Sequence, residues 1–130
     1  MMVSDRYEKG TAVRRAVLGN AYVDRKTEQT HAFDDEYQRY VIEAVWGEVW
    51  AREGLDRRSR SLITLAIAAA QGRMEEVALH IRGARNNGVT PEELKELMLH
   101  VAVYAGVPAA NEAHRIAKRV LAEEMVEGSI

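Results

Sequence analysis

Helix start and stop signals divide this sequence into a succession of short helices. Only two prolines occur, while alanine, leucine, glutamate and arginine, which favour helices, are plentiful. Thr90, Pro91 and Glu93 form a strong helix start, with a threonine at the N-cap, a proline in the first turn and a glutamate at the third position. The sequence therefore predicts an all-α protein.

Apolar residues recur at helical spacing along most of the chain. From Leu62 to Ala70 they occupy every side of the predicted helix apart from Thr64, so this helix should be central and covered all round. Residues 22–31 are polar, and we expect an irregular arm there, with at most one helical turn, that packs on a neighbouring subunit. Altogether we expect about six helices, over residues 5–18, 35–52, 56–72, 73–87, 90–104 and 109–125.

Composition limits the classes of function. The length suits a single domain over residues 1–130, and the net charge of -2 shows no basic excess of the kind that binds nucleic acid. No run of eighteen apolar residues could span a membrane, and the N-terminus lacks the apolar region of a secretory signal. The absence of cysteine excludes disulfides and thiolate nucleophiles and fits a cytoplasmic protein.

A candidate acid/base site lies in the segment from Gln71 to Gly88. Glu76 and His80 are four residues apart, so they share one side of a helix, and Gly83 leaves open space one turn later. A histidine beside a carboxylate in such a setting suits proton transfer, although a hydrogen-bonded structural histidine is the simpler alternative. Glu76 and His80 could supply two metal ligands, but spacing offers no third, so we predict no metal site.

Two further clusters allow both a structural and a functional interpretation. Trp46 and Trp50 share a helix face, with Glu48 on a different side, and either belong to the core or an interface or wall a ligand pocket. Arginines 57, 58 and 60 crowd a helix N-terminus, where the helix dipole disfavours cations. Carboxylates of a neighbouring element or an anionic ligand should therefore face them.

Four segments of the chain stand out together: RRAVLGNAYVDR, AVWGEVWAREGLDRRSRSLITLA, ALHIRGARNNGVTPEELKELMLH and VYAGVPAANEAHRIAKRVL. In their order and spacing they resemble the carboxymuconolactone decarboxylase family, within the alkylhydroperoxidase D-like superfamily, and the resemblance extends over roughly residues 8–122. It implies an alkylhydroperoxidase D-like helical bundle assembled into a homo-oligomeric ring, commonly a hexamer built as a trimer of dimers.

The peroxidase branch of that superfamily carries a glutamate, a Cys-x-x-Cys pair and a histidine four residues later. Here His80 holds the histidine place, whereas Arg73 and Glu76 hold the cysteine places and Ser61 holds the glutamate place. Disulfide-relay chemistry has no nucleophile without these thiols. The resemblance therefore favours the decarboxylase branch.

That branch implies cofactor-free decarboxylation of 4-carboxymuconolactone to the β-ketoadipate enol-lactone, in protocatechuate breakdown. The electron pair left by CO2 can spread through the ring double bond to the lactone carbonyl, so the substrate carries its own electron sink. The protein must hold the carboxylates, donate hydrogen bonds to the carbonyl oxygen and protonate the adjacent carbon. We expect His80 to be the proton donor or the carbonyl-side donor, with Glu48 or Glu76 orienting it or acting as the acid.

The remaining site residues are assigned by chemistry and rough position. Arg85 and Arg52 are candidates for the carboxylates because arginine binds them through two parallel hydrogen bonds, and Trp46 and Tyr104 for the apolar wall. The expected partner is a small anionic lactone. Two alternatives stay open: a related lyase acting on another lactone or β-keto-type acid, and a non-catalytic helical oligomer that serves as a binding protein.

Overall fold

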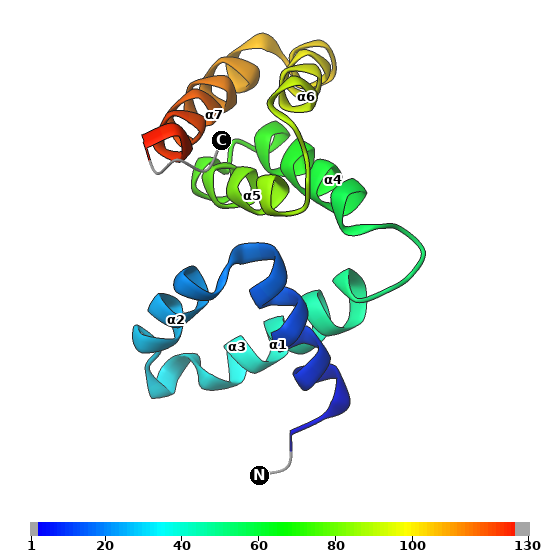
Figure 1. Ribbon diagram of the computed structural model, residues 1–130, viewed down its shortest axis with the longest axis vertical. Coiled ribbons are helices and arrows are strands. Elements are labelled where there is room, and N and C mark those ends of the chain that lie inside the picture. The colour runs from blue at the N-terminus through cyan, green and yellow to red at the C-terminus, as the bar shows by residue number, and fades with distance from the viewer. Residues whose placement is uncertain (1–2, 127–130) are drawn as a thin grey trace. The chain divides into compact units, whose positions relative to one another are not determined.

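The computed structural model describes residues 3–126, and these residues form helices joined by short turns (Figure 1). Seven α-helices, a 3-10 turn and a π-helix are present among them, against the six helices expected. The prediction of an all-α fold is confirmed. The chain divides into two compact units, up to Arg57 and from Arg58 onward. The expectation of a single domain stays a prediction.

The first unit begins with α1 (Asp5–Leu18), where the hydroxyl of Ser4 accepts a hydrogen bond from the backbone N–H of Tyr7 at 3.1 Å. Gly19 ends α1 with a φ of 90°, and α2 (Asn20–Glu28) starts directly after it. The expectation of irregular structure is therefore wrong for residues 22–28, whereas the packing of this segment on a neighbouring subunit stays a prediction. Glycine at a positive φ reverses the chain without strain, so a second helix forms at once and buries Val23.

The rest of this unit is one helical run, made of η1 (Ala32–Asp34), α3 (Asp35–Val41) and the π-helix η2 (Ile42–Trp50). It agrees with the helix expected over residues 35–52. η2 packs against α1, and two glycines bring the backbones together. A Cβ atom added to Gly10 would lie 2.8 Å from the backbone nitrogen of Gly47, which is closer than side-chain carbons approach.

The second unit contains α4 (Arg57–Ala70), α5 (Met74–Asn86), α6 (Pro91–Tyr104) and α7 (Val107–Val126) (Figure 1). Its core includes fully buried Leu65, Ile81 and Val120, one from each of α4, α5 and α7. The predicted capping box at the start of α6 is confirmed: the hydroxyl of Thr90 accepts from the N–H of Glu93 at 3.1 Å, and the Glu93 carboxylate accepts from the N–H of Thr90 at 2.9 Å.

The expectation that α4 is covered all round is wrong. Ser61, Leu65 and Ala69 are buried, but Ile63 and Ile67 on another side of the helix are 48% and 52% exposed. An apolar composition on every side thus does not guarantee that every side is covered. Across residues 3–126, no helix combines the length and the apolar character needed to cross a bilayer.

Candidate functional site

Helix α5 carries the buried histidine that the sequence singles out. His80 is 8% exposed, and its Nε2 atom lies 3.5 Å from a carboxylate oxygen of Glu76, one turn earlier. Glu76 is about half exposed, so it joins the buried imidazole to the surface. The expected pairing of these two residues on one side of the helix is confirmed.

The surroundings of His80 determine its charge. Burial lowers the pKa of His80 below the ordinary value of 6.5, and the nearby Glu76 carboxylate opposes that shift without cancelling it. The imidazole is therefore neutral near pH 7 and offers one N–H donor and one nitrogen acceptor. A neutral imidazole can donate a hydrogen bond to a carbonyl oxygen, and it needs a proton before it can act as an acid.

Ser61 and Asn87 form a second polar contact in this unit that the predicted site omits. The Nδ2 atom of Asn87 donates to the hydroxyl of Ser61 at 2.9 Å, and Ser61 is 1% exposed. Asn87 follows His80 by two helical turns, which is the sequence signal for a shared side. A buried serine in an otherwise apolar helix interior requires such a partner.

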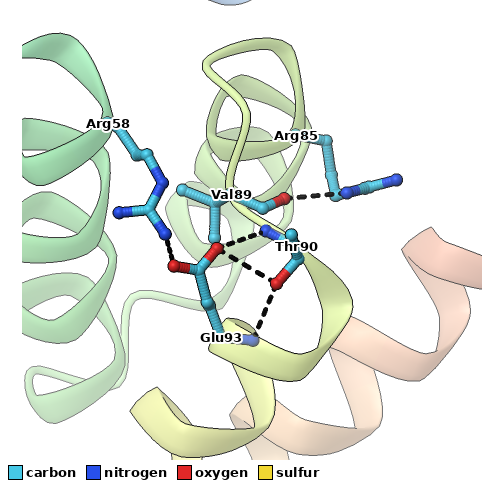
Figure 2. A network of polar contacts seen from close by, with 5 residues as sticks. All are labelled: Arg58, Arg85, Val89, Thr90 and Glu93. Atoms are coloured by element: carbon cyan, nitrogen blue, oxygen red, sulfur yellow. Dashed lines mark hydrogen bonds and ion pairs between the residues drawn. The ribbon is translucent and has the colours of Figure 1, made fainter.

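Arg85 is held by protein groups. Its Nη1 atom donates to the carbonyl of Val89 at 2.8 Å (Figure 2). Its Nε atom lies 3.0 Å from the carboxylate of Glu124 on α7. Both side chains of this ion pair are largely buried, with 19% and 13% exposed. Arg85 thus fastens the α5–α6 connection to α7, and its role in substrate binding stays a prediction.

Arg58 pairs with Glu93, the residue that caps α6 (Figure 2). Glu93 also accepts hydrogen bonds from the N–H and the hydroxyl of Thr90. One carboxylate therefore joins the N-terminal ends of α4 and α6. Of the two explanations for the crowded arginines, a carboxylate of another helix is confirmed for Arg58.

Glu48 and Arg52 belong to the first unit, where they lie close together. The carboxylate of Glu48 is 3.5 Å from Arg6 and 4.0 Å from Arg52, and all three side chains are more than half exposed. The predicted role of Glu48 beside His80 and that of Arg52 with substrate stay predictions.

The two tryptophans of η2 pack on each other. The ring centroids of Trp46 and Trp50 are 5.0 Å apart, and both residues are buried. In the second unit Tyr104 is 81% exposed, and its ring centroid lies 5.3 Å from that of His100. Trp46 thus belongs to the core of its unit, and the predicted pocket walls at Trp46 and Tyr104 stay untested.

Histidine, cysteine, aspartate and glutamate are the side chains that most often hold metal ions in proteins. Among residues 3–126, no group of three or more such side chains is arranged to hold a metal ion. Glu76 and His80 therefore have no third ligand of these types within the described part of the chain.

Fold and site define a small all-helical protein with a buried histidine beside a half-exposed glutamate on helix α5. The chain belongs to the carboxymuconolactone decarboxylase family, whose model matches residues 35–119. It is 47% identical over 115 residues to the 4-carboxymuconolactone decarboxylase of Acinetobacter baylyi, covering 88% of this chain and 86% of that one.

Two further relatives belong to the comparison. The nitrosuccinic acid decarboxylase of Metarhizium robertsii is 40% identical over 122 residues, covering 94% of this chain and 85% of the relative. A 4-carboxymuconolactone decarboxylase of Pseudomonas putida is 44% identical over 43 residues, which cover 33% of this chain and 90% of the relative. The resemblance seen in the sequence is therefore confirmed.

Proposed function

We propose that this protein is a carboxy-lyase that decarboxylates 4-carboxymuconolactone to the β-ketoadipate enol-lactone without a cofactor. The observation that carries the proposal is the 47% identity to a 4-carboxymuconolactone decarboxylase across 88% of the chain. The buried His80, with Glu76 beside it, supports the proposal, because the reaction needs a hydrogen-bond donor in a water-poor setting and no metal or Schiff base.

In the proposed reaction the bond between the γ-carbon and its carboxylate breaks, and CO2 leaves. The electron pair moves through the ring double bond onto the lactone carbonyl oxygen, which gives a dienolate. A proton then adds to the carbon next to the carbonyl and restores an uncharged lactone ring, while the acetate arm keeps its carboxylate. Charge builds up on the carbonyl oxygen in the first step, so a donor that meets this oxygen accelerates it.

His80 supplies that donor in our proposal, either as a hydrogen bond to the carbonyl oxygen or as the proton for the adjacent carbon. Its lowered pKa favours the first role in the resting protein, since a neutral imidazole retains an N–H but carries no proton to release as an acid. Glu76 orients the imidazole, and Glu48 is the other candidate acid.

Arg52 and Arg85 are the candidates for the two substrate carboxylates, and Trp46 and Tyr104 for the apolar wall. Arg52 is the better candidate of the two arginines, because its side chain is exposed whereas Arg85 is committed to Glu124. We further propose a homo-oligomeric ring, with a hexamer as the expected size, and a cytoplasmic location. The absence of cysteine fits that location.

The identity to a nitrosuccinic acid decarboxylase favours a second candidate substrate. Nitrosuccinate also carries two carboxylates, and its nitro group can accept the electron pair left by a departing CO2. Both compounds therefore require the same groups from a protein: cations that bind two carboxylates, and a hydrogen-bond donor for the atom that receives the negative charge.

The deciding experiment supplies 4-carboxymuconolactone and nitrosuccinate separately to the purified protein and measures CO2 release, with loss of lactone ultraviolet absorbance as a second readout. We expect turnover of the lactone that exceeds turnover of nitrosuccinate. Turnover of nitrosuccinate alone would replace the first candidate by the second. If the protein turned over neither compound but still bound a dianionic lactone analogue, it would be a binding protein and not a decarboxylase.

A further inference from the structure

The helical run at the start of α3 exposes an aromatic ridge, made of Phe33, Glu36, Tyr37 and Tyr40. These residues are spaced by three, one and three positions, so they share one side of the helix. Phe33 is the only phenylalanine of the chain and is 96% exposed, and Tyr37 and Tyr40 are about two-thirds exposed. A continuous row of exposed aromatic side chains marks an interaction surface more often than a free one.

The second unit carries an open groove of about 350 Å³ between α6 and α7. Each helix contributes four residues at the same spacing as the ridge: Lys95, Met98, Leu99 and Ala102 from α6, and Val107, Ala110, Asn111 and His114 from α7. The floor is apolar. Because α6 and α7 form a hairpin, Lys95 and His114, which lie farthest from the connection, occupy the same end of the groove.

Ridge and groove match in length, polarity and charge. The ridge and each side of the groove span eight residues, a rise of about 10 Å along a helix axis. The ridge offers aromatic rings and the groove an apolar floor. Glu36 lies within the ridge and Asp35 beside it, whereas Lys95 and His114 give the groove a basic end. Lys95 also meets Glu92 at 3.0 Å, but both side chains are well exposed, so this pair is weak and easily exchanged.

We propose that the aromatic ridge of one copy of this chain docks into the α6–α7 groove of a second copy. The groove suits a helix better than a small molecule, because its polar lining residues Lys95, Asn111 and His114 are all exposed and none is fixed deep in the floor. Every copy carries both surfaces, so the contact is heterologous and can repeat until a ring closes.

Phe33→Ala tests the contact directly, since a side chain that is 96% exposed contributes little to the fold of its own copy. Sedimentation equilibrium over a concentration series should show an oligomer for the wild type and at least about thirtyfold weaker association for the variant, the loss typical of an interface hot spot. The matched control is Leu55→Ala, an exposed apolar residue outside both surfaces, which should associate like the wild type.

A charge exchange tests the predicted register. Glu36→Lys and Lys95→Glu should each weaken association about tenfold by placing like charges together, and the double variant should recover most of the loss. Recovery in the double variant would not occur if the two residues met different partners. A monomeric wild type, a Phe33→Ala variant that associates normally, or single charge variants without effect would each overturn the proposal.

Discussion

The region around Glu48 in the first unit and the region around Arg85 in the second unit both pair arginine with glutamate, but they differ in exposure. Glu48 meets Arg6 at 3.5 Å and Arg52 at 4.0 Å with every side chain more than half exposed. Arg85 meets Glu124 at 3.0 Å, and neither side chain is more than 19% exposed. Water screens the first pairing, so it is weak and exchangeable, whereas the second is part of the scaffold.

This difference in exposure distinguishes Arg52 from Arg85, although the sequence alone makes both equal candidates for binding substrate. In the proposed role of Arg52, a substrate carboxylate competes with a pairing to Glu48 that solvent already weakens. A substrate carboxylate that displaced Glu124 from Arg85 would leave Glu124 as a largely buried charge without its cation.

The largest effect is expected from breaking the buried pair. Arg85→Met should lower the free energy of unfolding by about 3 kcal/mol, because it leaves Glu124 charged and poorly solvated. Urea denaturation followed by circular dichroism measures this loss, and Glu124→Leu added to Arg85→Met should recover part of it. An unchanged unfolding midpoint with a raised KM would instead assign Arg85 to the substrate.

Next in size is the effect on the reaction. His80→Ala should lower kcat at least about a hundredfold, the usual contribution of one acid/base or donor group, while the helices remain folded. Steady-state assays with 4-carboxymuconolactone measure the loss. His80→Gln, which retains an N–H donor, should keep more activity than His80→Ala if the carbonyl-side role is right. A near-normal kcat in a folded His80→Ala variant would show that His80 is not a catalytic residue.

A smaller effect is expected from changing Arg52, the exposed arginine of the first unit. Arg52→Gln should raise KM about tenfold through the loss of a charged hydrogen bond to the substrate, with a change in unfolding free energy under about 1 kcal/mol. Arg6→Gln is the matched control, because Arg6 pairs with the same glutamate but has no predicted role with substrate. Equal KM values for the two variants would contradict the assignment of Arg52.

The smallest effect concerns pH. Because burial lowers the pKa of His80 in the folded state, the unfolded chain binds the proton more tightly, and its pKa is about 6.5. The stability contributed by the neutral imidazole is therefore present above pH 6.5 and is lost as pH falls toward the folded pKa. Urea midpoints between pH 7.5 and 5.5 should fall more for the wild type than for His80→Gln. Parallel curves would show that His80 titrates equally in both states.

Local signals predicted most of the helices and part of the site. The capping box at Thr90 and Glu93 and the i, i+4 pair of Glu76 and His80 depend on residues within one turn, so the sequence displays them directly. The partner of Arg85 is 39 residues away on another helix, and no local pattern indicates which glutamate it meets. The contact between Asn87 and Ser61 is similarly remote, with a separation of 26 residues.

The errors have equally specific causes. The polar composition of residues 20–28 concealed a helix whose start depends on the backbone freedom of Gly19. In α4 the apolar residues on all sides suggested full burial, yet Ile63 and Ile67 are exposed, because composition does not state which neighbours a helix has.

The meeting of α1 and η2 at Gly10 and Gly47 also bears on how the first unit can change over generations. The contact there is between backbone atoms, so a change of side-chain rotamer cannot make room for an added methyl group. Most surface positions accept substitutions after small local adjustments. A residue larger than glycine at either of these two positions requires one helix to move away from the other. We therefore expect both positions to remain glycine, since an added side chain at Gly10 would meet the backbone of η2 and one at Gly47 would meet the backbone of Arg6.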